Sequence, residues 1–157
     1  MQIIILMGSP NDDPIARKAI ETIESFEIPW RLHIASAHKS PRRLLDLLAE
    51  YEADPQPKVY LTIAGRSNAL SGMVDAQVST PVIACPPSSS SFSGADVFSS
   101  LRMPSGVAPV VVLDPHNAAL AAVKMLALAE PALKTAVTQS QAAQRQRLVE
   151  ADAAHRE

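Results

Sequence analysis

The sequence predicts an α/β protein with a five-stranded parallel sheet between two layers of helices. Two observations favour this class: short aliphatic runs alternate five times with segments of helical periodicity, and the runs are almost continuously apolar. Such alternation is the pattern of a parallel sheet with helices on both faces, and continuous apolar runs are typical of strands buried on both faces. Five strands in this arrangement suit a flavodoxin-like, three-layer αβα sandwich whose switch point lies between the first and third strands.

The first half of the chain supplies three predicted strands and three predicted helices. Each strand is an aliphatic run followed by turn residues, and Pro14 is a residue tolerated in the first turn of a helix. In order, these elements are a strand at residues 3–7, a helix from Asp12 or Asp13 to about residue 28, a strand at 30–35 expected to be buried, a helix at 41–52, a strand at 59–64 and a short helix ending near residue 78.

The second half adds a strand at residues 81–84, a helix at 95–101, a strand at 110–113 and a helix at 118–129. Between the first two of these lies the serine run Ser88–Ser91, whose composition alone indicates a flexible loop. Pro131 opens a last, extended helix that becomes polar beyond Gln139 and has few large apolar residues. We therefore expect it to be solvated or to bridge subunits. Residues 1–157 are predicted to be one domain, with a core at about 1–130 and the C-terminal helix at 131–157.

Composition limits the function classes. The chain has 157 residues, of which 47% are hydrophobic and 19% charged, enough for a folded core. Its net charge of −2 gives no bulk attraction for nucleic acid or an anionic membrane. Cys85 is the only cysteine, which excludes an internal disulfide and fits a cytoplasmic location. No apolar stretch has membrane-spanning length, and the N-terminus lacks the basic region of a signal peptide.

Polar loops follow each of the first four predicted strands. In a parallel sheet these loops rise from the same end, so one site could collect side chains from all of them. The candidates are Ser9, Asp12, Ser36, His38, Lys39, Gly65, Ser67 and Asn68.

The segment from Ser36 to Arg42 is the most informative of these loops, because it places His38 where a strand ends and a helix begins. A helix N-terminus suits an anion such as phosphate, and an imidazole can move protons near neutral pH. The alternative interpretation is that Ser36 or Ser40 caps the helix and His38 is an exposed loop residue. The segment alone leaves both open.

Several common chemistries lack their motifs. There is no Gly-x-Gly-x-x-Gly after the first strand, no Walker A lysine, no metal-ligand spacing and no nucleophile elbow. What remains is phosphate binding by loop N–H groups, serines and Lys39, with His38 as proton carrier. Asp12 would repel a phosphate, so it is expected either to accept hydrogen bonds from sugar hydroxyls or to cap the helix. Arg66 and Arg102 are loop cations that could reach an anion or form surface pairs.

Ordered motifs extend along the chain to about residue 130. They are Met7-Gly8-Ser9-x-x-Asp12, Ser36-Ala37-His38-Lys39, Ala64-Gly65-Arg66-Ser67-Asn68-Ala69-Leu70-Ser71-Gly72, Ala84-Cys85-Pro86-Pro87, Phe92-Ser93-Gly94-Ala95-Asp96, Ser99-Ser100-Leu101-Arg102-Met103-Pro104-Ser105-Gly106 and Asn117-Ala118-Ala119. In this order and spacing they resemble the phosphoribosylaminoimidazole carboxylase (PurE) family of purine biosynthesis. The resemblance also implies that the serine run is a structured loop of the site.

The family has two branches, and the resemblance is to the second. Class I enzymes are mutases that rearrange the carbamate of 5-aminoimidazole ribonucleotide (AIR), with arginine after Ser-Ala-His and a third loop containing His-Leu-Pro-Gly. This chain has Lys39 and Gly65-Arg66-Ser67-Asn68 instead. These are similar to class II, the carboxylases that use carbon dioxide directly.

The resemblance implies an octamer in which the C-terminal helix reaches neighbouring subunits. It implies conversion of AIR and carbon dioxide to 4-carboxy-5-aminoimidazole ribonucleotide (CAIR), with His38 as proton carrier at C4 and no metal, biotin or ATP. The residues implied to bind the ribonucleotide are Ser9, Asp12, Ser36, Lys39, Gly65 and Ser67, with Ser67, Asn68 and Ala69 as the expected wall of the carbon dioxide pocket. The alternatives are class I mutase activity and a non-catalytic nucleotide-binding or assembly domain.

Overall fold

The computed structural model describes residues 1–88 and 91–155. Its strands are β1 (Gln2–Met7), β2 (Trp30–Ile34), β3 (Lys58–Ile63), β4 (Val82–Ala84) and β5 (Val110–Val111). Its helices are η1 (Pro10–Asp12), α1 (Asp13–Ser25), α2 (Pro41–Glu52), α3 (Leu70–Asp75), η2 (Ser91–Val97), α4 (Phe98–Leu101), α5 (Pro115–Leu126) and α6 (Pro131–Ala154), where η marks a 3₁₀ helix.

The strands form one sheet in the order β2-β1-β3-β4-β5, and every pair is parallel. In the two pairs that β1 forms, Ile5 lies opposite Leu32 of β2 and Leu61 of β3. The order reverses between β1 and β3, as the flavodoxin-like prediction requires. The fold class and the switch point are therefore confirmed.

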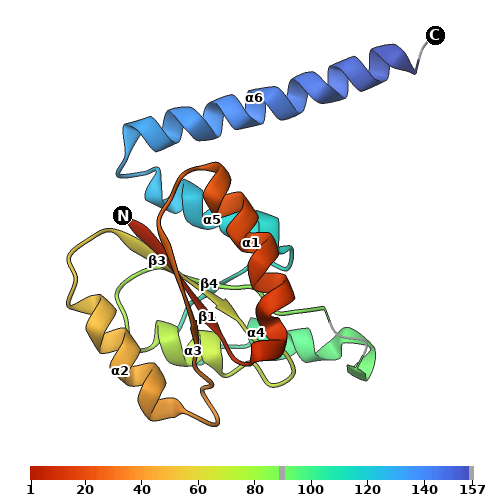
Figure 1. The fold of residues 1–157 in the computed structure, drawn as a ribbon. Coiled ribbons are helices and arrows are strands. Elements are labelled where there is room, and N and C mark those ends of the chain that lie inside the picture. The colour runs from red at the N-terminus through yellow and green to blue at the C-terminus, as the bar shows by residue number, and fades with distance from the viewer. Residues whose placement is uncertain (89–90, 156–157) are drawn as a thin grey trace.

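Helices cover both faces of the sheet (Figure 1). Because successive strand residues point to opposite faces, Ile3 and Ile5 pack into a cluster with α1 and α5. Ile4 and Leu6 pack into a second cluster with α2 and α3. These four side chains of β1 are fully buried. Because both faces of the strand are covered, its sequence does not alternate between apolar and polar residues.

The strand β2 differs from its prediction. It was expected to be buried, but it lies at the edge of the sheet, and Arg31 and Ile34 are exposed. Its apolar sequence reflects one covered face rather than two. The first helix also ends earlier than predicted, at Ser25, because Glu27 adopts a left-handed backbone conformation with φ 55° that stops the helix.

The segment after β4 is less regular than predicted. The expected helix at 95–101 is a 3₁₀ helix, η2, followed by the single turn α4. Just before this range, Ser93 and Gly94 both have positive φ, at 52° and 79°, so no α-helix continues back through these two residues. The expectation for the serine run falls on residues 89 and 90, which lie outside the described residues. Farther on, α5 begins at Pro115, where Asp114 accepts a hydrogen bond from the Asn117 N–H.

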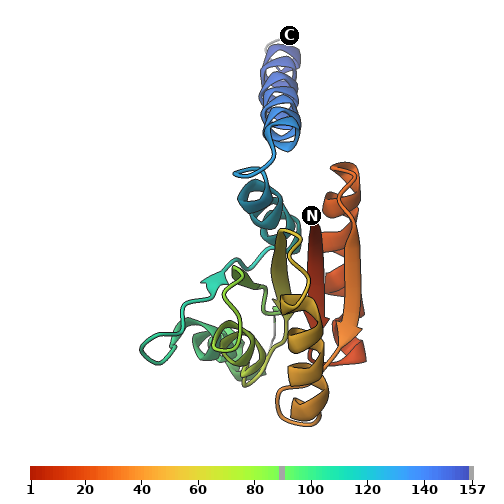
Figure 2. The ribbon, with the colours of Figure 1, turned by 90° about the vertical axis from the view of Figure 1, so that its left-hand side faces the viewer.

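The C-terminal helix α6 begins at Pro131, as predicted, and projects away from the sheet (Figures 1 and 2). Only Leu133 and Val137 of this helix are buried, near its start. Leu148 and Val149, near its far end, are exposed. In the part of the chain that the structure describes, no helix is long and apolar enough to span a membrane.

Candidate active site

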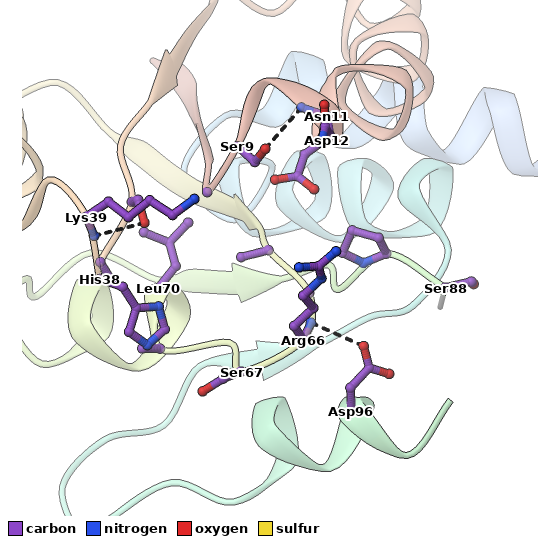
Figure 3. Close-up of a pocket in the computed structure, with 17 residues that line it drawn as sticks. Ser9, Asn11, Asp12, His38, Lys39, Arg66, Ser67, Leu70, Ser88 and Asp96 are labelled. Atoms are coloured by element: carbon purple, nitrogen blue, oxygen red, sulfur yellow. Dashed lines mark hydrogen bonds between the residues drawn. The ribbon is translucent and has the colours of Figure 1, made fainter. Parts of the chain in front are cut away.

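A pocket of about 560 Å³ opens at the carboxyl end of the sheet, where the loops after β1, β2, β3 and β4 meet (Figure 3). The predicted site residues that line it are Ser9, Asp12, Ser36, His38, Lys39, Gly65 and Ser67. Asn68 is the one predicted site residue that does not line the pocket. The convergence follows from the parallel sheet, because residues far apart in sequence emerge from adjacent strands on the same side.

The first loop places Ser9 and Asp12 on one wall of the pocket. Ser9 Oγ accepts a hydrogen bond from the Asn11 N–H at 3.2 Å and so caps the short helix η1. Asp12 precedes α1, but its side chain makes no capping hydrogen bond to that helix, and Figure 3 shows its carboxylate directed into the pocket. Burial raises the pKa of this carboxyl above its ordinary value, and a backbone hydrogen bond involving Ser9 lowers it by less.

Gly8 allows the first and third loops to approach each other. A Cβ atom at this position would lie 3.1 Å from the Cβ of Ala64 and 3.8 Å from Asp12 Oδ2. The first distance is tighter than an ordinary van der Waals contact, so a side chain here would push the walls of the pocket apart.

The second loop closes on itself between Ser36 and Ser40. Ser40 Oγ accepts a hydrogen bond from the Ser36 N–H at 2.9 Å and lies 3.3 Å from the Ser36 carbonyl oxygen. Ser36 Oγ in turn accepts a hydrogen bond from the Lys39 N–H at 3.2 Å. Neither serine side chain caps α2. The serines instead hold a tight turn from which His38 and Lys39 project. The expected serine cap is therefore wrong, whereas His38 is an exposed loop residue, as the same alternative expected.

His38 and Lys39 are both exposed at the pocket. The His38 ring makes no hydrogen bond to another described residue. An imidazole placed in this way can exchange a proton with a bound molecule. The Lys39 ammonium group extends over the pocket from the same turn (Figure 3), where it can attract an anion.

The third loop is hydrogen-bonded to η2 and α4. The Arg66 N–H donates to Asp96 Oδ2 at 3.1 Å, and Ser99 Oγ donates to the Arg66 carbonyl oxygen at 2.8 Å. Ser99 Oγ also accepts a hydrogen bond from the Asn68 N–H at 3.0 Å. These bonds hold Arg66 at φ 59°, a left-handed conformation that costs a non-glycine residue about 1–2 kcal/mol.

Asn68 does not line the pocket, which corrects its predicted place in the wall. It is 4% exposed, and its Nδ2 donates to Ser100 Oγ at 2.9 Å while its Oδ1 accepts from the Ser71 N–H at 3.3 Å. The amide thus ties the third loop to α4 and caps the start of α3. Near it in the chain, Ser67, Ala69 and Leu70 line the pocket.

The fourth loop contributes Pro87 and Ser88. Pro87 packs against Gly65, where a Cβ atom would lie 3.5 Å from the proline Cδ. Cys85, at the end of β4, is fully buried, and burial with a smaller effect from Asp114 raises its thiol pKa to about 12. A thiol with this pKa stays protonated at neutral pH, so Cys85 acts as a small, inert apolar residue.

Three histidines lie elsewhere. His33 Nε2 lies 2.7 Å from the Tyr51 hydroxyl, and His116 Nδ1 lies 3.1 Å from Thr22 Oγ1. His155 is exposed near the end of α6. Across residues 1–88 and 91–155, no group of three or more His, Cys, Asp or Glu side chains could hold a metal ion.

Sequence reasoning left Arg66 undecided and gave no role to Asn11 or Asp96, all of which line the pocket. The left-handed conformation of Arg66 and its bond to Asp96, thirty residues away, have no signal in local patterns. Arg102, the other undecided cation, does not line it.

Comparison with known proteins gives concordant matches. The family model for AIR carboxylase matches residues 2–147. A phosphoribosylaminoimidazole carboxylase of Treponema denticola is 47% identical over 150 residues, covering 96% of this chain and 94% of that protein. One of Archaeoglobus fulgidus is 48% identical over 152 residues, covering 97% and 83%. The crystal structure of Treponema denticola PurE has a TM-score of 0.95 at 47% identity, covering 97% of this chain and 96% of that one.

Proposed function

The chain belongs to the AIR carboxylase family, and we propose that it carboxylates AIR with carbon dioxide to form CAIR, with His38 as the proton carrier at C4. The family and the names of the relatives support carboxylation of AIR in purine biosynthesis. The proton carrier, the identity of the carbon donor and the residues that bind the nucleotide are the further parts of the proposal.

One observation carries the role of His38. Its imidazole is exposed at the pocket, makes no hydrogen bond to another described residue, and stands on a turn held by Ser36 and Ser40. A proton carrier needs both properties: a free ring nitrogen and a fixed position. No other histidine lines the pocket, so among the described residues His38 is the candidate.

The chemistry balances without another catalytic group. The aminoimidazole ring is an enamine, so its C4 carbon is nucleophilic. C4 forms a bond to the carbon of carbon dioxide, and one C=O π pair moves to oxygen to give the carboxylate. The intermediate carries both hydrogen and carboxylate at C4. His38 removes that proton, and the C–H electron pair restores the aromatic ring. In reverse, protonated His38 delivers the proton and carbon dioxide leaves.

This route gives metal, biotin and ATP no step, because C4 is already nucleophilic and carbon dioxide is already electrophilic. Ala69 and Leu70 add apolar surface to the pocket, which suits a small uncharged molecule such as carbon dioxide. The ribonucleotide would bind through residues of the first three loops, namely Ser9, Asp12, Ser36, Lys39, Gly65 and Ser67.

Direct use of carbon dioxide, rather than rearrangement of a carbamate, is proposed from two loops. Lys39 follows Ser36-Ala37-His38, and Arg66-Ser67-Asn68 forms the third loop, both similar to class II. The third loop also has its own anchorage to α4 through Asn68 and Ser99.

We also propose that the chain assembles as an octamer. The far end of α6 exposes Leu148 and Val149, with exposed fractions of 72% and 62%, and the body exposes Phe98 and Leu113. Covering such side chains with a second copy would remove apolar surface from water. Sedimentation of the purified chain tests the assembly, and a stable monomer would contradict it. A cytoplasmic location stays a prediction.

The deciding experiment measures product formation by the purified protein in two parallel reactions. One reaction contains AIR and bicarbonate, and the other contains the pre-formed carbamate with free carbon dioxide scavenged. Product in the first and none in the second is expected. Turnover of the carbamate would mean mutase activity, and nucleotide binding without turnover in either would mean a non-catalytic domain.

A further inference from the structure

We infer that Arg66 binds an anionic oxygen group of the nucleotide, either its phosphate or the carboxylate that CAIR carries and AIR lacks. The inference deepens the proposed function and rests on it for the identity of the ligand. Figure 3 shows the Arg66 side chain standing in the middle of the pocket, with Asp12 on one side and Asp96 on the other. Its guanidinium group makes no hydrogen bond or ion pair with another described residue.

The backbone of Arg66 does not need the arginine side chain. Asp96 accepts its N–H and Ser99 donates to its carbonyl oxygen, and a glycine would make both bonds. Glycine would also adopt φ 59° without the steric strain of a Cβ atom. Strained residues held by their surroundings are often found at binding sites. What arginine adds at this position is therefore the guanidinium group in the pocket.

Neither of the two carboxylates near Arg66 forms an ion pair with its guanidinium group. Asp96 is engaged with the Arg66 N–H. Asp12 is not within ion-pair distance, since the only ion pair found among the described residues joins Arg17 and Asp13. The pKa of the Asp12 carboxyl is raised by burial, whereas a close cation would lower it. The guanidinium group thus keeps its hydrogen-bond donors for a ligand.

A guanidinium group is suited to oxyanions. Its planar fork matches a carboxylate or a phosphate with two parallel hydrogen bonds, whereas a lysine ammonium acts as a point charge. The pocket presents one cation of each kind, Lys39 from the second loop and Arg66 from the third. CAIR carries two anionic groups, so the pocket has a cation for each.

The test replaces Arg66 with glycine and with lysine and measures binding of AIR and CAIR separately by titration calorimetry. Glu27→Gly is the matched control, because Glu27 has nearly the same backbone conformation, with φ 55°, but does not line the pocket. We expect Arg66→Gly to raise the Kd for CAIR about tenfold or more and to leave the Tm unchanged or higher. Arg66→Lys should recover part of the affinity. Glu27→Gly should raise the Tm without changing either Kd.

Comparing AIR with CAIR shows which of the two anionic groups Arg66 binds, because only CAIR carries the carboxylate. Weaker binding of CAIR alone assigns Arg66 to the carboxylate, and equal weakening of both assigns it to the phosphate. The inference would be overturned if Arg66→Gly left both Kd values within twofold of wild type. It would also be overturned if Arg66→Gly and Arg66→Lys lost the same affinity and both had a lower Tm. Wild-type protein that binds CAIR but does not turn it over would refute the proposed function alone. The Kd values of the Arg66 variants would still test whether Arg66 binds the nucleotide. Failure of the wild type to bind either nucleotide would refute both.

Discussion

Polar groups at the two ends of the sheet are used in opposite ways. At the amino end, a hollow of about 420 Å³ is lined by Glu52 and Thr80 among others. There Glu52 accepts hydrogen bonds from the Tyr60 hydroxyl at 3.1 Å, the Thr80 hydroxyl at 2.8 Å and the Ser79 N–H at 3.3 Å. Burial, with a smaller effect from Glu52, raises the pKa of the Tyr60 hydroxyl, so it remains a donor.

At the carboxyl end, by contrast, the bonds hold the backbone and leave the side chains available. Ser36, Ser40, Asp96 and Ser99 fix two loops, while the ring of His38 and the guanidinium group of Arg66 make no bond to a described residue. The difference indicates which hollow is built for a ligand. Groups that satisfy one another stabilise the fold, and groups that are held in place without a partner are ready to bind.

The largest expected effect is on catalysis. His38→Asn should lower kcat for carboxylation by about 10²–10⁴-fold, because asparagine cannot exchange a proton as imidazole does. The Tm should not change, since His38 is exposed. Steady-state kinetics with AIR and bicarbonate, together with thermal unfolding, measures both. A variant with more than a tenth of the wild-type kcat would remove His38 from the mechanism.

A substitution at the amino end of the sheet should change the stability of the fold rather than catalysis. Glu52→Ala leaves the hydroxyls of Tyr60 and Thr80 without their acceptor, so the free energy of unfolding should fall by about 1–3 kcal/mol. Urea denaturation measures the change, and the KM for AIR should stay within twofold. Glu50→Ala, on the exposed face of the same helix, is the control and should change stability by no more than about 0.5 kcal/mol. A KM that rises with Glu52→Ala would contradict the division between the two ends.

Lys39→Ala should weaken nucleotide binding more than it slows the chemistry. The side chain is exposed, so we expect a rise of about tenfold in the KM for AIR, with kcat within threefold. Arg42→Ala removes a neighbouring cation that does not line the pocket and should leave both values unchanged. An unchanged KM with a reduced kcat would refute the binding role of Lys39.

The smallest effect concerns Asp12 and depends on pH. Because the pKa of its carboxyl is raised in the folded protein, the folded state binds this proton more tightly than the unfolded chain does. The group therefore destabilises the fold above its raised pKa, and the penalty disappears as the pH falls below the ordinary value of 3.8. Asp12→Asn should raise the free energy of unfolding at pH 7 by at most about 0.5 kcal/mol.

Urea denaturation from pH 7 to pH 3 checks this behaviour, and the gain should shrink toward the acid end. The same variant should bind AIR more weakly, because an amide accepts hydrogen bonds from sugar hydroxyls less strongly than a carboxylate does. A gain in stability that persists at pH 3 would mean that burial of the charge is not its cause.

The sequence by itself determined what depends on local patterns. Aliphatic runs separated by turn residues were enough to predict a parallel sheet, its switch point and the bounds of α2 at Pro41–Glu52. They also brought His38, Lys39 and Asp12 to one end of the sheet, because parallel strands impose that on any loops that follow them. The ordered motifs were enough to indicate the family.

Only the tertiary structure decided what depends on neighbours distant in sequence. An apolar run does not say whether a strand is central or at the edge, so the prediction that β2 is buried is wrong. Asn68 is a polar loop residue that looks like a ligand, and its contacts with Ser99 and Ser100, thirty-one and thirty-two residues away, place it beneath the loop instead. Other long-range bonds, from Asp96 and Ser99, hold the backbone of Arg66 at the pocket. Periodicity reports which face of an element is covered, whereas hydrogen bonds between loops form only once the sheet has brought those loops together.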